Sequence, residues 1–151
     1  MGAYLRDIRQ SADEVPDLVI KRITDRAGLA AWMDVWMHFD DGRREPREKL
    51  YASLGVTGNE PLRHYLAWWR GEPVAVSQLF LGHSAAGLYC VATLPEARGR
   101  GIGTAITLAP LRDAHASGYD VAVLAPSRES HGMYQRIGFN LFPSTACYFV
   151  I

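Results

Sequence analysis

The segment 91–104 places an apolar strand, a loop rich in arginine and glycine, and the start of a helix in direct succession. It reads Val-Ala-Thr-Leu-Pro-Glu-Ala-Arg-Gly-Arg-Gly-Ile-Gly-Thr. Glycines at 99, 101 and 103 allow a tight turn in which successive backbone N–H groups point at one position. The helix N-terminus behind them adds partial positive charge. The segment therefore indicates an α/β fold with a loop that suits a diphosphate.

Two common nucleotide-binding loops fit this segment less well. A Rossmann loop reads Gly-x-Gly-x-x-Gly, but Ile106 stands where the third glycine would follow Gly101 and Gly103. A Walker loop requires a lysine after its last glycine, and the loop has none. A glycine-rich turn that merely links the strand to the helix remains the simplest alternative.

A second element follows at a spacing that fits one helix and one strand, and it reads Tyr134-Gln-Arg-Ile-Gly138-Phe139. The order Arg-x-x-Gly-x-Gly at 98–103 resembles the acyl-CoA pyrophosphate loop of the GNAT superfamily of N-acyltransferases. The second element resembles the helix and turn that carry a tyrosine beside the thioester in that superfamily. The resemblance covers about residues 18–151. It implies an α/β GNAT fold, whose mixed central sheet has helices on both faces and splays open at the acyl-CoA site.

The resemblance implies an N-acetyltransferase that moves an acetyl group from acetyl-CoA to the amine of a small molecule, by direct attack in a ternary complex. Backbone groups of Val91, Ala92 and Thr93 would hold the pantetheine arm and polarise the thioester carbonyl. Tyr134 would protonate the departing sulfur, because its hydroxyl is a donor at neutral pH. The pyrophosphate would rest on backbone N–H groups of Gly99, Arg100, Gly101, Ile102, Gly103 and Thr104.

Several of these residues have a plainer interpretation. The guanidinium groups of Arg98 and Arg100 suit phosphate, but both could be solvated surface side chains. Ser127 stands where many family members have an asparagine that bonds to the cofactor, and it could equally be a helix N-cap. Tyr134 could pack against Phe139 with its hydroxyl at the surface.

Charge and composition limit the other classes of function. The chain has 151 residues, enough for one domain, with 16 basic and 16 acidic residues. The balance provides no bulk field for nucleic acid or an acidic membrane. No apolar run approaches a membrane span, and residues 1–10 lack a signal-peptide core, so we expect a cytoplasmic protein. No histidine or cysteine spacing indicates a metal site.

The periodicity predicts a domain over 18–151, preceded by a polar arm, 1–17, that is disordered or docks on a neighbour. Within the domain, a strand at 18–23 precedes a helix capped by Asp25, and a second helix with Pro46 in its first turn ends near Gly55. A hairpin follows around Gly71-Glu-Pro73, then a strand into the loop. A helix from 103 should kink at Pro110 and end at Gly118. A strand at 119–125, a helix at 128–137 and one or two strands within 139–151 complete the order.

The first half of the domain is rich in aromatic residues, which the periodicity assigns mostly to the core. A subset lining a pocket would select a bulky or partly apolar amine. The sequence identifies no general base, since each candidate is more often a simple surface residue, and it leaves a homodimer open. The alternative function is a catalytically inactive acyl-CoA-binding or sensor protein, against which Tyr134 argues. The aromatic residues are Trp32, Trp36, Phe39, Tyr51, Tyr65, Trp68, Trp69 and Tyr89, and the candidate bases are His38, Asp40, Glu60, His83 and Glu96.

Overall fold

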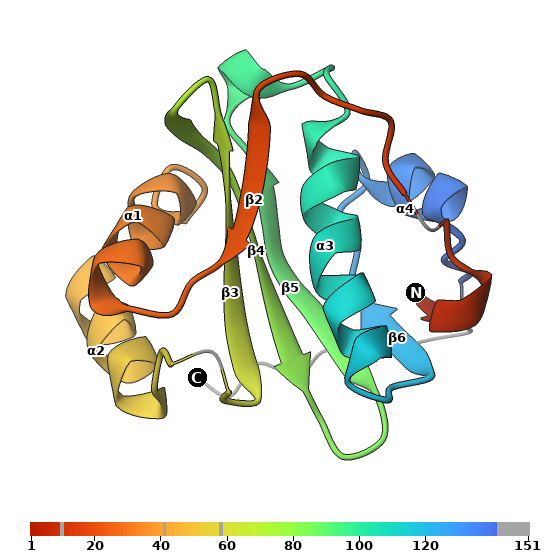
Figure 1. Cartoon of the computed structure of the whole chain (residues 1–151), viewed down its shortest axis with the longest axis horizontal. Helices are drawn as coiled ribbons and strands as arrows, with labels where there is room; N and C mark the ends of the chain where they lie inside the picture. Colours follow the sequence, from red (N-terminus) through yellow and green to blue (C-terminus); the bar gives the residue numbers. More distant parts are fainter. Residues whose placement is uncertain (10, 41, 58, 142–151) are drawn as a thin grey trace.

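The computed structural model describes residues 1–9, 11–40, 42–57 and 59–141. Within them a mixed six-stranded sheet has the order β1-β6-β5-β4-β3-β2. Helices α1 and α2 cover one face, and α3 and α4 lie on the other (Figure 1). The predicted α/β class is confirmed. The strands are β1 (Gly2–Tyr4), β2 (Leu18–Arg22), β3 (Leu62–Trp69), β4 (Glu72–Leu81), β5 (Ala86–Thr93) and β6 (Val121–Leu124). The helices are α1 (Arg26–Trp36), α2 (Arg44–Leu54), α3 (Ile102–Ala116) and α4 (His131–Ile137), with 3₁₀ turns η1 (Leu5–Asp7) and η2 (Pro95–Ala97).

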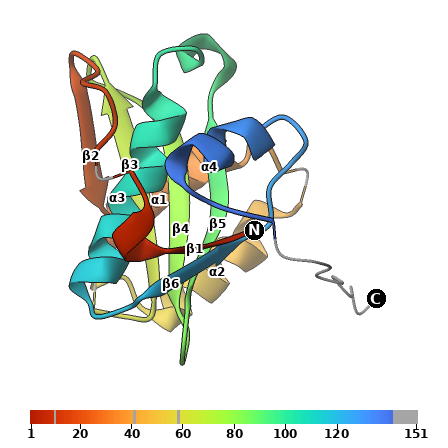
Figure 2. The ribbon, with the colours of Figure 1, turned by 90° about the vertical axis from the view of Figure 1, so that its right-hand side faces the viewer.

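The first residues of the chain belong to the sheet. Strand β1 pairs antiparallel with β6 and forms one edge (Figure 2). Ala3, Leu5 and Ile8 are buried in the same core as α3 and α4. Residues 2–8 therefore belong to the folded domain. The sequence had predicted that the whole segment 1–17 is a polar arm that is disordered or docks on a neighbour. A strand of three residues is too short to show a period, and its partner is more than a hundred residues away.

The two helices on the first face begin and end as predicted. The Asp25 carboxylate accepts a 2.7 Å hydrogen bond from the Gly28 N–H and caps α1. Trp32 and Met33 of α1 are fully buried against the sheet. Helix α2 has no fully buried residue among those described, and it ends at Gly55, whose φ of 93° suits glycine. Of the two helices, α1 therefore supplies the buried residues on this face.

Helix α3 runs without interruption through Pro110, which is buried. Proline has no N–H, so the carbonyl of Ile106 receives no bond from the position four residues later. The Ser77 hydroxyl on β4 donates a 2.8 Å hydrogen bond to that carbonyl oxygen instead. Gly118, with a φ of 90°, follows the helix as predicted. The sheet therefore supplies the bond that proline removes.

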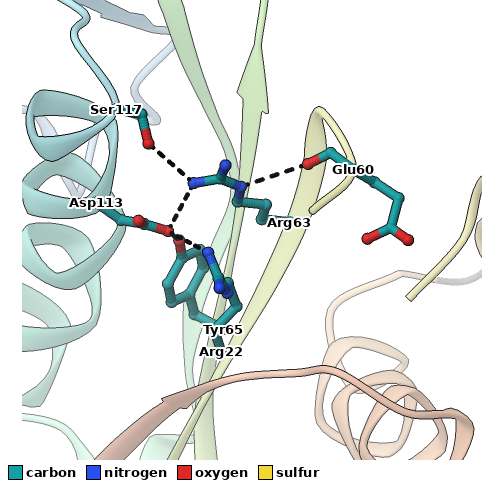
Figure 3. A network of polar contacts seen from close by, with 6 residues as sticks. All are labelled: Arg22, Glu60, Arg63, Tyr65, Asp113 and Ser117. Atoms are coloured by element: carbon teal, nitrogen blue, oxygen red, sulfur yellow. Dashed lines mark hydrogen bonds and ion pairs between the residues drawn. The ribbon is translucent and has the colours of Figure 1, made fainter. Parts of the chain in front are cut away.

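A polar network fastens the other end of α3 to the sheet (Figure 3). One carboxylate oxygen of Asp113 accepts hydrogen bonds from Arg22 at 3.2 Å, from Arg63 at 3.0 Å and from the Tyr65 hydroxyl. Arg63 also donates to the Ser117 hydroxyl at 3.2 Å. Burial by itself would raise the pKa of Asp113, but the Tyr65 hydrogen bond and the two arginine charges outweigh it and lower that pKa. Asp113 is therefore a carboxylate at neutral pH.

Two predicted boundaries differ from the structure. The β3–β4 turn consists of Arg70 and Gly71, both with positive φ, and Glu72 and Pro73 belong to β4. Helix α4 begins at His131, three residues later than predicted. The predicted final strands lie largely outside the described residues. Within the described residues, an isolated bridge between Asn140 and Gly2 adds one pairing to the edge of the sheet.

Candidate active site

The sheet opens between its two parallel strands. β5 and β6 pair only where Ala86, Gly87 and Leu88 face residues 122–124. β5 continues to Thr93 against β4, and β6 runs obliquely to it (Figure 2). Among the described residues, the part of β5 after Leu88 has no strand partner on the β6 side. A cavity of about 530 Å³ lies here. The predicted splay of the sheet is confirmed.

A β-bulge shapes the strand edge that faces this cavity. The register passes from the pair Val76–Ala92 directly to the pair Gln78–Tyr89, which leaves residues 90 and 91 opposite a single residue of β4. Cys90 has a φ of 50°, in the left-handed region that non-glycine residues rarely adopt. Val91, Ala92 and Thr93 all line the cavity. The three predicted strand positions are therefore together at the site.

The glycine loop closes one end of the cavity. Gly99 and Gly101 have φ values of 72° and 81°, and α3 begins at Ile102 directly behind them. A Cβ on Gly103 would lie 3.4 Å from the Met133 sulfur and 3.6 Å from the Thr93 hydroxyl. A side chain at 103 would therefore contact both α4 and β5 and fill part of this end of the cavity. The Ile102 side chain is in the core, so only its backbone could serve a ligand.

The structure separates the two arginines of the loop. Arg98 lines the cavity, and its Nε donates a 3.0 Å hydrogen bond to the Thr93 carbonyl oxygen. Both arginines are exposed, but Arg100 is not among the described lining residues, and its guanidinium stacks over the Trp69 ring at 4.6 Å. Thr104, in the first turn of α3, is partly buried. Arg98 is thus the arginine placed for a ligand in the cavity.

Tyr134 lies on α4 and is one of the residues that line the cavity. It is 5% exposed, and its ring meets Phe139 edge-on at 6.0 Å. The ring does pack against Phe139, but the hydroxyl does not lie at the open surface. Burial raises the pKa of Tyr134 to about 12, despite an opposing contribution from the Thr107 side chain. The hydroxyl therefore keeps its proton at neutral pH.

Ser127 lines the cavity but does not cap α4. Its hydroxyl lies 2.9 Å from that of Ser130, and the Ser130 N–H donates to it at 3.2 Å. These bonds stabilise a turn before the helix, which explains why α4 begins at His131. Ser127 and Ser130 both line the cavity.

The sequence analysis did not single out Glu129, Ser130 and Met133, which also line the cavity. The available signal is the spacing of Ser130, Met133 and Tyr134 at three and four positions, as on one face of a helix. Of the eight aromatic residues considered, Trp36 and Phe39 line the cavity.

None of the candidate bases is among the described residues that line the cavity. Asp40 lies at the end of α1, where it accepts hydrogen bonds from the Trp36 indole at 3.1 Å, from the Gly42 N–H at 2.8 Å, and from Arg47. Glu96 is exposed on η2. The carboxylate that does line the cavity is Glu129. Among the described residues, no cluster of histidine, cysteine and carboxylate side chains could hold a metal ion.

A mixed sheet that splays open, with a glycine loop at a helix N-terminus beside the opening, is the arrangement that the resemblance in the sequence implies. The chain belongs to the Acetyltransferase (GNAT) family, whose family model matches residues 28–139. The mycothiol acetyltransferase of Streptomyces scabiei (strain 87.22) is 29% identical over 130 residues, which are 82% of this chain and 42% of that protein. The chain thus spans less than half the length of this relative.

Solved structures agree on the fold. A GCN5-related N-acetyltransferase from Kribbella flavida superposes with a TM-score of 0.72 at 16% identity, over 92% of this chain and 52% of that one. AAC(6')-Iy, solved with the bisubstrate analogue CoA-S-monomethyl-acetylneamine, gives a TM-score of 0.76 at 16% identity, over 89% of this chain and 98% of that one.

The residues present fit an acyl-CoA. An open strand edge can pair with the amide-bearing pantetheine arm as an added strand would. A loop with two left-handed glycines before α3 presents backbone N–H groups to a diphosphate. The cavity connects these two parts beside Tyr134, with Gly103 in its lining.

A separate finding concerns membranes. None of the helices in the described part of the chain has the length and the apolar character of a membrane span.

Proposed function

We propose that this protein transfers the acetyl group of acetyl-CoA to the amine of a small molecule, by direct attack in a ternary complex. The observation that carries the proposal is the shared cavity: the Val91–Thr93 edge, Gly99 and Gly103 of the loop, and Tyr134 all line it. Acyl transfer needs groups that bind the cofactor, groups that polarise the thioester carbonyl and a group that stabilises the departing sulfur. In this proposal all three are available in one place.

Each group has a separate task in this proposal. Backbone groups of the β5 edge hold the pantetheine arm and donate a hydrogen bond to the thioester oxygen as it gains charge. Tyr134 donates a hydrogen bond to the sulfur as the C–S bond breaks. Complete proton transfer from a phenol with a pKa of about 12 to a thiolate of ordinary pKa near 8.5 is uphill. Hydrogen-bond donation is therefore the step that this hydroxyl supports best, and the departing thiolate takes up, by way of water, the proton that the amine loses as the C–N bond forms.

The acceptor is proposed to be an amine with an apolar or aromatic portion. Trp36 and Phe39 line the cavity from the end of α1, and Glu129 adds a carboxylate that attracts an ammonium group. The total charge is balanced, with sixteen basic and sixteen acidic residues, and gives no reason to expect an acidic trough that would bind a polyamine. An amino-acid derivative or an arylalkylamine fits this lining better than a protein tail.

Calorimetry with acetyl-CoA tests the site. We expect binding by the wild-type chain and loss of binding in Gly101→Glu, which places charge and bulk at the loop. Gly118→Glu is the matched control, because Gly118 also has positive φ at a helix end with nothing within 4 Å of its Cβ position. It should bind as the wild type does. Equal binding by both variants would remove the loop from the site.

A competition among amines tests the acceptor. Arylalkylamines and amino-acid amides are compared with spermidine, kanamycin and a lysine-rich peptide at equal concentration. We expect a preference for the first two classes, and a preference for any of the others would contradict the acceptor assignment alone. Tight acetyl-CoA binding without turnover on any amine would support the inactive, sensing alternative. A cytoplasmic location and a homodimer stay predictions.

A further inference from the structure

We infer that Trp32 is a positioning residue for this reaction: through Ser77 it holds the β5 bulge that presents Val91 to the cavity. The inference rests on the proposed function and adds a residue that does not touch the cavity. Trp32 is fully buried on α1, and the described lining residues do not include it. Trp32 can therefore act on the reacting group only through its neighbours: the sheet at Ser77, and Trp36, which lines the cavity and whose ring stacks on that of Trp32 at 6.0 Å.

The bulge is a conformation that its surroundings must hold. Cys90 has a φ of 50°, which costs free energy in any residue other than glycine. Residues 90 and 91 both lack a partner in the β4–β5 register. Relaxation of Cys90 toward an ordinary strand conformation would rotate the backbone of Val91, whose N–H direction matters if it polarises a carbonyl.

Ser77 is the β4 residue opposite the bulge, and it is held from both faces of the sheet. The indole N–H of Trp32 donates a 3.1 Å hydrogen bond to the Ser77 carbonyl oxygen. The Ser77 hydroxyl donates to the Ile106 carbonyl on α3 at 2.8 Å, where Pro110 leaves that acceptor free. A helix on each face thus fixes this one residue of β4.

The bulged residue itself is tied to the same cluster. The Cys90 thiol contacts the Gln78 amide oxygen at 3.7 Å, and Gln78 lies 2.9 Å from His64. The His64 ring in turn meets Trp32 edge-on at 4.8 Å. Trp32 therefore supports both strands of the bulge, Ser77 by a hydrogen bond and Cys90 through packed polar side chains.

Removing the indole N–H takes one hydrogen bond from a buried carbonyl oxygen, which favours a shift of β4 at Ser77. Trp32→Phe keeps an aromatic ring and deletes the donor. We expect the turnover number to fall about 10-fold, while the acetyl-CoA dissociation constant changes less than about 2-fold. Val35→Ala is the matched control, because Val35 is buried on the same helix and in the same cluster. It should lose stability and keep its turnover number.

Infrared spectroscopy of bound acetyl-CoA, labelled with ¹³C at the thioester carbonyl, separates positioning from stability. In the wild type, the carbonyl stretch should shift to lower frequency than in solution. In Trp32→Phe that shift should shrink by about half or more, since the donor is misdirected. In Val35→Ala the wild-type shift should be retained. Benzothienylalanine at position 32 replaces only the N–H by sulfur, and it serves the same test if the phenylalanine variant does not fold.

The outcomes distinguish this inference from the proposed function. Absence of acetyl-CoA binding by the wild type would overturn the proposed function and the inference together. Binding with the same carbonyl shift in the wild type and in both position-32 variants would overturn the inference alone. A reduced shift in Val35→Ala equal to that in Trp32→Phe would also overturn it, because general loosening of α1 would then suffice.

Discussion

The Nε of Arg98 donates a 3.0 Å hydrogen bond to the carbonyl oxygen of Thr93, so the glycine loop is tied back to the strand that precedes it. The bond fixes the loop relative to the open edge of β5. It also orients the guanidinium group, because the Nε–H is used in this bond and the terminal N–H groups are left for a ligand. Arg98 therefore combines two tasks, loop placement and charge near the diphosphate site.

Arg98→Gln should weaken acetyl-CoA binding by about 10-fold, because it removes the positive charge and the forked N–H donors of the guanidinium group. Arg100→Gln is the control, since Arg100 is exposed and stacks on Trp69. Its dissociation constant should change less than about 3-fold. Calorimetry at fixed ionic strength measures both, and equal losses would show that only general positive charge matters.

Tyr134→Phe should lower the turnover number by about 10- to 100-fold with little change in acetyl-CoA affinity, because the ring contact with Phe139 is kept and only the donor is lost. Steady-state kinetics with a fixed amine and a binding titration check the two halves. An undiminished turnover number would assign Tyr134 to packing.

His64 should make the fold sensitive to mild acid. Burial lowers the pKa of His64 to about 4, whereas an unfolded chain titrates near 6.5. The unfolded state therefore binds more protons between these values, and stability should fall by up to about 3 kcal/mol as the pH decreases from 6.5 to 4. Burial also raises the pKa of Cys90, to about 12, and that of Tyr51, so these neighbours stay neutral in this window.

Urea denaturation from pH 7.5 to 4 measures this dependence. His64→Gln should be less stable at neutral pH but should show a smaller slope between pH 6.5 and 4. A slope equal to that of the wild type would mean that other groups dominate acid unfolding.

Ser77 and Pro110 should be energetically coupled. Ser77→Ala leaves the buried Ile106 carbonyl without its donor and should cost about 1–2 kcal/mol of unfolding free energy. In a Pro110→Ala background the backbone N–H at 110 can bond to that carbonyl, so the same substitution should cost less than half as much. A double-mutant cycle by urea denaturation measures the coupling, and equal costs in both backgrounds would contradict it.

Local signals in the sequence predict much of this fold. Asp25 and Gly118 define helix ends because capping depends on neighbouring residues alone. The pairing of β1 with β6 depends on residues far apart, so the sequence of the first strand does not reveal it. The late start of α4 depends on a bond between two serine hydroxyls, which competes with helical geometry.

The site divides in the same way. The glycines and Tyr134 are identified by short-range order, whereas the bulge at Cys90 arises from how β4 and β5 pair. Trp32 and Trp36 are both tryptophans of α1, yet Trp32 is in the core and Trp36 lines the cavity. The difference depends on which face the sheet covers, a property of tertiary packing.

Amine-dependent release of CoA thiol from acetyl-CoA tests the central claim most directly. The wild-type chain should release one thiol for each acetylated amine formed, with an arylalkylamine as acceptor, and Gly101→Glu should release none above background. Gly118→Glu should match the wild type. Saturable acetyl-CoA binding with no amine-dependent thiol release, across arylalkylamines, amino-acid amides, spermidine, kanamycin and a lysine-rich peptide, would contradict the account.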